Sequence, residues 1–139
     1  MKSDSFFDDT NACFERLQEK KMSEYLPDKL AEFTLKCLGD RWKVLIIQNL
    51  LDGTKRFGEL KRELGNITQK VLTSNLRLLE EKGILVRKVY AQIPPRVDYT
   101  LTQLGYELKP VIDSMIAWAE EYRKNMAKIL NIELPEYAK

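Results

Sequence analysis

The feature that most constrains the fold is a pair of short helical patterns separated by Gly65-Asn66. In residues 57–64, apolar side chains recur at helical spacing: Phe57, Leu60 and Leu64. Residues 68–82 form the second pattern, with Thr68 as a candidate N-cap and Gly83 as a stop signal. A short helix, a tight turn with glycine and a second amphipathic helix make a helix-turn-helix.

The second helix has two chemically different faces. At about 100° per residue, one side is apolar, and the opposite arc carries Gln69, Lys70, Thr73, Ser74 and Arg77. No carboxylate falls on that arc before Glu80, near the end of the helix. Gln, Ser, Thr, Lys and Arg donate hydrogen bonds to bases and phosphates, whereas acids would repel a duplex. The arc and the helix N-terminus at Thr68 therefore predict DNA contacts, although a solvated face that happens to lack acids fits the pattern equally well.

A basic hairpin is predicted to follow. Residues 84–90 and 97–102 are rich in β-branched and aromatic side chains, and the 91–96 loop between them contains two prolines. Five basic side chains at the hairpin or just before the first helix are expected to contact phosphates or the minor groove: Lys55, Arg56, Arg87, Lys88 and Arg96. Residues 54–97 hold 10 Lys/Arg against 4 Asp/Glu, whereas the whole chain has a net charge of only +2. This middle segment is the part suited to a polyanion.

The remaining patterns predict further helices. We expect a polar helix over residues 8–24, a helix over 28–38 capped by Asp28, and a central core helix that follows Asp40 and contains Trp42. Thr102 should cap a long apolar-striped helix that bends or restarts at Pro110. The predicted fold class is mainly α with a small β-hairpin (α+β), a winged helix-turn-helix in a chain of 139 residues.

Composition argues against an enzyme. The chain has no histidine, which excludes Ser-His and Cys-His nucleophilic sites and zinc sites with a histidine ligand. Two cysteines cannot complete an all-thiolate metal site, and no Gly-rich phosphate loop stands out. We therefore expect no catalytic residues, no metal and no cofactor.

A cytoplasmic protein that does not enter a membrane is expected. No run of 18 or more apolar residues could span a bilayer. Asp4, Asp8 and Asp9 lie where a signal peptide would need its apolar region. Two cysteines also fit a reducing compartment.

Four stretches resemble the HxlR family of winged helix-turn-helix transcriptional regulators. In order they are "GDRWKVLI", "RFGELKREL", "ITQKVLTSNLRLLEEKGIL" and "PPRVDYTLTQLG", and the resemblance covers roughly residues 26–120. It implies a homodimer that binds an inverted repeat in double-stranded operator DNA. The DNA-binding domain would be residues 27–102, and residues 1–26 and the helix and tail of 103–139 would form the dimer. We expect a repressor.

The resemblance also raises the question of a redox or electrophile signal. Many members of that family look to have a cysteine about thirteen positions before the tryptophan that matches Trp42, and this chain has Lys29 there. Several relatives sense electrophiles or oxidants through a cysteine. Cys37 lies near the end of its predicted helix and is expected to be a small buried hydrophobe. Cys13 is the better candidate for a reactive thiol. Both cysteines stay candidates for redox sensing.

Two other functions are compatible with the same residues. The winged helix could be a protein-interaction module without specific DNA binding, whose basic segment contacts an acidic partner. Alternatively, the regulator could sense a small apolar ligand held near Trp42.

Overall fold

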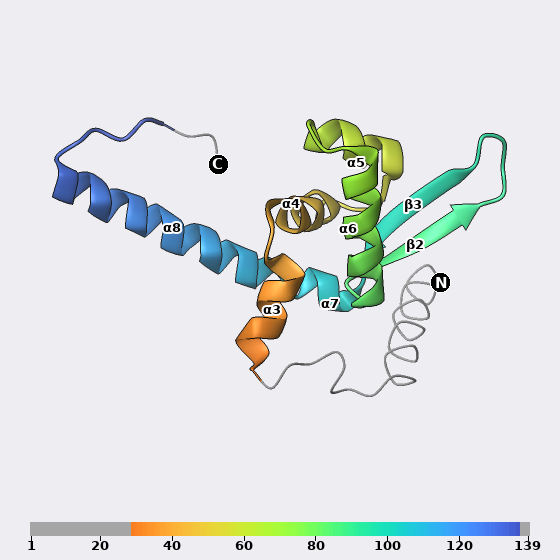
Figure 1. The fold of residues 1–139 in the computed structure, drawn as a ribbon, viewed down its shortest axis with the longest axis horizontal. Coiled ribbons are helices and arrows are strands. Elements are labelled where there is room, and N and C mark those ends of the chain that lie inside the picture. Colours follow the sequence, from red (N-terminus) through yellow and green to blue (C-terminus); the bar gives the residue numbers. More distant parts are fainter. Residues whose placement is uncertain (1–28, 137–139) are drawn as a thin grey trace. The chain divides into compact units, whose positions relative to one another are not determined.

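The computed structural model describes residues 29–136, and Figure 1 shows the order of the elements. The helices are α3 (Leu30–Leu38), α4 (Arg41–Leu50), α5 (Phe57–Leu64), α6 (Gln69–Glu81), α7 (Gln103–Tyr106) and α8 (Lys109–Leu130). The strands are β1 (Lys55–Arg56), β2 (Leu85–Tyr90) and β3 (Arg96–Leu101). The chain divides into two compact units, one ending at Glu107 and the other starting at Leu108. The helix expected over 8–24 lies outside the described residues.

The predicted fold class is confirmed, with one strand added. The described residues are mostly helical, and the sheet is antiparallel with the order β1-β3-β2. The sequence predicted only the β2–β3 hairpin, because β1 has two residues and is too short to show any alternation. Lys55 and Arg56 were predicted to precede the first helix of the motif, and they do so as this edge strand, opposite Tyr99 and Asp98.

Helix α4 is central to the core of the first unit, as predicted. Its Ile46, Ile47 and Leu50 are fully buried, and it packs against α5, α6 and β3. These elements contribute further buried leucines: Leu60 from α5, Leu72, Leu76 and Leu79 from α6, and Leu101 from β3. Each helix thus places its apolar stripe on one shared core, which leaves the polar arc of α6 facing outward.

One predicted helix start is confirmed and another is wrong. The side chain of Asp40 accepts a hydrogen bond of 2.9 Å from the backbone N–H of Lys43, which caps α4. Helix α3 begins at Leu30, with Lys29 rather than Asp28 as its N-cap residue and with no capping side chain. An aspartate side chain can cap a helix, but the N-cap is the residue directly before the first helical residue. With Leu30 as the first helical residue, that position belongs to Lys29.

Thr102 fixes the end of the wing rather than starting one long helix. Its buried Oγ1 accepts from the N–H of Gly105 at 3.2 Å and lies 2.5 Å from the carbonyl oxygen of Gly83. This residue therefore caps only the four-residue α7 and ties it to the chain that follows α6. A second segment, α8, starts at Lys109 with Pro110 in its first turn, so the predicted restart at this proline is confirmed.

Helix α8 of the second unit carries many exposed apolar side chains. They are Val111, Met115, Ile116, Trp118, Tyr122, Ile129 and Leu130. The rings of Trp118 and Tyr122 stack with their centroids 5.4 Å apart, and α8 ends in a left-handed Asn131. None of the helices between residues 29 and 136 is long and apolar enough to cross a lipid bilayer.

Candidate nucleic-acid interface

The N-terminus of α6 is set by Thr68. Its Oγ1 accepts a hydrogen bond of 3.2 Å from the backbone N–H of Val71, as the sequence predicted. The first N–H groups of any α-helix lack partners within the helix, and the helix dipole places partial positive charge there. The start of α6, at Gln69 and Lys70, can therefore hold an anionic oxygen.

The structure brings the five polar side chains of the α6 arc together. Gln69, Lys70, Ser74 and Arg77 are exposed and Thr73 is half-buried, while the leucines of the other face are buried. All five line one shallow depression of about 760 Å³. Glu81 borders its far end, so the donors are nearest the helix N-terminus and the acid is furthest from it.

A second depression, of about 300 Å³, connects α6 to the sheet. Gln69, Thr73 and Arg77 line this depression as well as the first. Arg87 of β2 and Tyr99 of β3 line it from the sheet. Arg87 is thus placed beside the polar arc of α6, and its part in binding stays a prediction.

A third depression, of about 680 Å³, lies between α5 and the loop of the hairpin. Its polar lining combines Arg56, Arg62, Gln92 and Arg96 with the acidic Glu59. Phe57 and Val97 line both this depression and the second one, so the three form one continuous surface, which we call the α6–wing surface. Arg62 and Gln92 are not among the predicted contacts, although Arg62 belongs to the basic segment 54–97 and lies on the polar side of α5.

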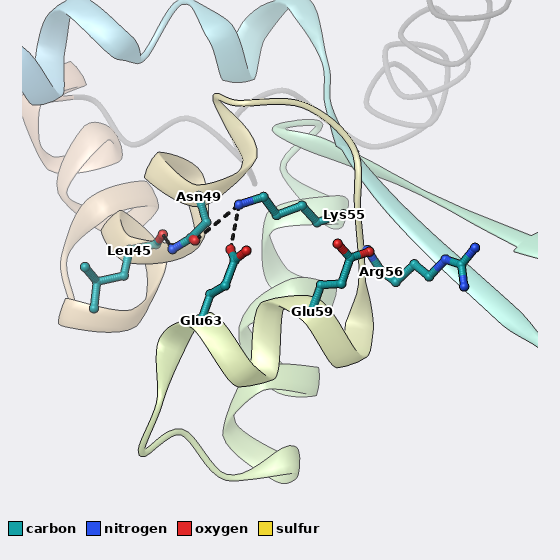
Figure 2. Close-up of polar contacts among 6 residues, drawn as sticks. All are labelled: Leu45, Asn49, Lys55, Arg56, Glu59 and Glu63. Carbon is teal, nitrogen blue, oxygen red and sulfur yellow. Dashed lines mark hydrogen bonds and ion pairs between the residues drawn. The ribbon is translucent and has the colours of Figure 1, made fainter.

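Lys55 and Arg56, which the sequence grouped together, have different surroundings (Figure 2). The ammonium of Lys55 lies 2.5 Å from Glu63 Oε2 and 3.5 Å from Asn49 Oδ1, and its side chain is only 15% exposed. The backbone N–H of Arg56 donates to Glu59 Oε1 at 3.1 Å, while its guanidinium points away from Glu59 in Figure 2. The charge of Lys55 is therefore balanced by Glu63, and that of Arg56 faces outward on the α6–wing surface.

The wing contains a compact group of charges around Tyr90. The guanidinium of Arg96 lies 3.8 Å from the centroid of the Tyr90 ring, and Lys88 Nζ lies 5.3 Å from it. Arg96 Nε is also 3.4 Å from Asp98 Oδ1. Lys88 remains exposed, whereas the side chain of Arg96 is 28% exposed and is held against the hairpin.

Of the two cysteines, Cys37 lies within the described residues and Cys13 does not. The Cys37 side chain is 2% exposed, as expected of a small buried hydrophobe. Burial raises the pKa of its thiol, against the opposing effect of the nearby Lys82 and Lys43 charges. Cys37 is therefore held as a protonated thiol.

Trp42 is the residue near which a small apolar ligand was considered. The guanidinium of Arg41 lies 4.8 Å from the centroid of its ring.

Comparison with known proteins identifies the family. The sequence model of the HxlR-like helix-turn-helix family matches residues 37–127. The uncharacterised HTH-type transcriptional regulator YdeP of Bacillus subtilis is 44% identical over 98 residues, which cover 70% of this chain and 77% of that protein.

Solved structures agree. The redox regulator HypR in its reduced form matches with a TM-score of 0.65 and 42% identity, over 72% of this chain and 99% of that one. The reduced form of the transcriptional regulator YodB from B. subtilis matches with a TM-score of 0.63 and 40% identity, over 70% of this chain and 94% of that one. All three relatives are described as regulators. The chain therefore belongs to the HxlR-like helix-turn-helix family of transcriptional regulators.

Proposed function

We propose that the protein binds double-stranded operator DNA sequence-specifically, with α6 in the major groove and the loop between β2 and β3 at the adjacent minor groove or backbone. The observation that carries this proposal is the continuity of the α6–wing surface. Its three depressions share residues and combine the donor-rich arc of α6 with basic side chains of α5 and the wing. A helix-turn-helix uses its second helix in this way.

The two kinds of contact fall on different residues. Gln69 and Arg77 have side chains long enough to reach base edges, where an amide recognises adenine and a guanidinium recognises guanine. Lys70, Thr73 and Ser74 share the arc and can donate to either bases or phosphates. Arg56, Arg87 and Lys88 would hold phosphates and supply the salt dependence. Lys55 has no part in the proposed contacts, because Glu63 balances its charge.

We further propose a homodimer on an inverted repeat. Large apolar side chains are exposed along α8, with Trp118 68% and Ile129 74% exposed, and exposed apolar side chains gathered on one element favour a protein–protein interface. Residues 103–139 would then contribute to the dimer together with residues 1–26. A two-fold symmetric protein reads two half-sites in opposite directions, about 34 Å or a multiple of it apart. A dimer bound at a promoter can block transcription without contacting the polymerase, so repression is the proposed outcome. The proposed location is the cytoplasm.

The proposed signal is an oxidant or electrophile. HypR is described as a redox regulator, and it shares 42% identity with this chain. Cys37 is shielded and protonated, so Cys13 is the proposed reactive thiol.

Selection of bound sequences from random duplex DNA, with and without a mild oxidant, tests these proposals. We expect enrichment of an inverted repeat, and release of that DNA after oxidation unless Cys13 is replaced by serine. Sedimentation of the complex should give two chains per repeat. Absence of any enriched sequence would contradict specific DNA binding and favour the protein-interaction module instead.

A further inference from the structure

One outward face of the sheet surrounds a single carboxylate with cations. In the strand register, Asp98 of the central strand β3 lies opposite Arg56 on β1 and Lys88 on β2, and Arg96 lies opposite Tyr90. Alternate residues of a strand share a face, and directly opposed residues are neighbours on it. Arg56, Lys88 and Arg96 therefore all flank Asp98.

The contacts within this group constrain Arg96 without using its hydrogen-bond donors. The guanidinium stacks on Tyr90 at 3.8 Å, and its Nε is 3.4 Å from Asp98 Oδ1. Both atoms of this ion pair are buried, and neither makes a hydrogen bond. The attraction is thus electrostatic, and the two terminal NH2 groups of the guanidinium, unlike the buried Nε, stay available for a ligand. The side chain of Asp98 is 15% exposed, so a ligand on the surface would meet Arg96 before it meets Asp98.

The position of Asp98 is unfavourable for simple attraction to phosphate. It is the only acidic residue between Ile84 and Leu101, and it reduces the positive charge of a wing that should bind a polyanion. A carboxylate at this point weakens binding to every DNA sequence alike. It benefits binding only if the orientation that it imposes on Arg96 matters for particular sequences.

We propose that Asp98 and Tyr90 are positioning residues that hold the Arg96 guanidinium for insertion into a narrow, A·T-rich minor groove beside each half-site. This inference rests on the proposed DNA binding. Arginine is attracted to narrow minor grooves because their negative potential is enhanced, and A-tracts have such grooves. Asp98 and Tyr90 therefore set sequence preference while neither contacts a base.

Fluorescence anisotropy of the full-length protein tests the inference, using the selected operator, a copy with G·C pairs in its flanks, and a scrambled duplex. For the unmodified protein, we expect the operator to bind more tightly than its G·C-flanked copy. In Asp98→Asn, that preference should fall about tenfold, as for loss of one good base contact. Binding of the scrambled duplex should be unchanged or tighter, because the wing has lost a negative charge.

Two Tyr90 variants make the test independent of whether Asp98→Asn folds. Tyr90→Phe keeps the ring under Arg96 and should keep the preference for A·T flanks, whereas Tyr90→Leu should lose it. An unchanged preference in both Asp98→Asn and Tyr90→Leu would overturn the inference, as would an equal loss of affinity for all three duplexes. If the unmodified protein did not distinguish the operator from the scrambled duplex, the proposed function itself would fail. If it did so but ignored the flanks, only the inference would fail.

Discussion

The ammonium of Lys55 lies 2.5 Å from the carboxylate of Glu63, so the charge of this basic side chain is balanced by a neighbour on α5. Its neighbour Arg56 points outward (Figure 2). Lys55 thus serves an ion pair within the protein and Arg56 is left for a ligand, although the two residues are adjacent in the sequence.

The first prediction compares Lys55→Gln with its matched control Arg56→Gln. Removing Arg56 should reduce the slope of log affinity against log salt by about one, the effect of losing one phosphate contact. Removing Lys55 should leave that slope unchanged and lower the free energy of unfolding by about 1 kcal/mol or less, since Glu63 is well exposed. DNA titrations at several salt concentrations and urea denaturation measure both. An equal fall in slope for the two variants would contradict the assignment.

The second prediction concerns Gln69 and Arg77, which line the first two depressions. Gln69→Ala and Arg77→Ala should each weaken binding to the selected operator by about 1–3 kcal/mol. Binding to scrambled DNA should change little for Gln69→Ala, because that side chain is uncharged. Competition titrations with both duplexes measure the difference. Equal losses on both duplexes would show that Gln69 does not read bases.

The third prediction tests the cap of α6. Thr68→Ala removes the acceptor for the Val71 N–H and should lower the free energy of unfolding by about 1 kcal/mol. Thr68→Ser keeps a hydroxyl at the same place and should retain most of the stability. Chemical denaturation of the three proteins gives the comparison. Similar losses for alanine and serine would mean that the methyl group, and not the hydroxyl, supports the helix start.

Much of the fold and of the α6 arc could be predicted because they depend on local patterns. The caps at Asp40 and Thr68 and the apolar stripe of α6 are set by residues within one or two turns of each other. Strand β1 could not be predicted, because its two residues extend only by pairing with Tyr99 and Asp98, more than forty positions away.

The same limit applied to the charges of the candidate site. Summed charge singled out residues 54–97 as the basic segment, and the basic residues that line the α6–wing surface all fall within it. It treated Lys55 and Arg56 as equivalent, since the pairing of Lys55 with Glu63 and Asn49 appears only when α4 and α5 pack. It also gave Asp98 no role, because the register that surrounds this carboxylate with cations is a tertiary property.

The fourth prediction concerns a close approach at Gly105. A Cβ at this position would lie 2.3 Å from the backbone carbonyl oxygen of Ile84 and about 3 Å from the Leu101 side chain. Gly105→Ala should therefore push α7 away from the wing and lower the free energy of unfolding by about 3 kcal/mol. Gly58→Ala is the matched control, because nothing lies within 4 Å of its added methyl group and alanine favours the helix. Thermal or urea unfolding that ranked the two variants in the opposite order would contradict this packing.

The last prediction follows from the buried thiol of Cys37. Burial raises the pKa of this thiol in the folded protein, so the folded state holds the proton more tightly than the unfolded chain does. Stability from this group is complete below the unfolded pKa of about 8.5 and is lost as the pH rises toward the folded pKa, by at most about 1.4 kcal/mol per pH unit. In a Cys13→Ser background, urea unfolding at pH 7.5 and 9.5 should show this loss, and replacing Cys37 by alanine should remove that part of the pH dependence. The same background should react slowly with a thiol reagent at neutral pH until the protein is unfolded. Rapid reaction of the folded Cys13→Ser protein would show that Cys37 is accessible and would restore it as a candidate sensor.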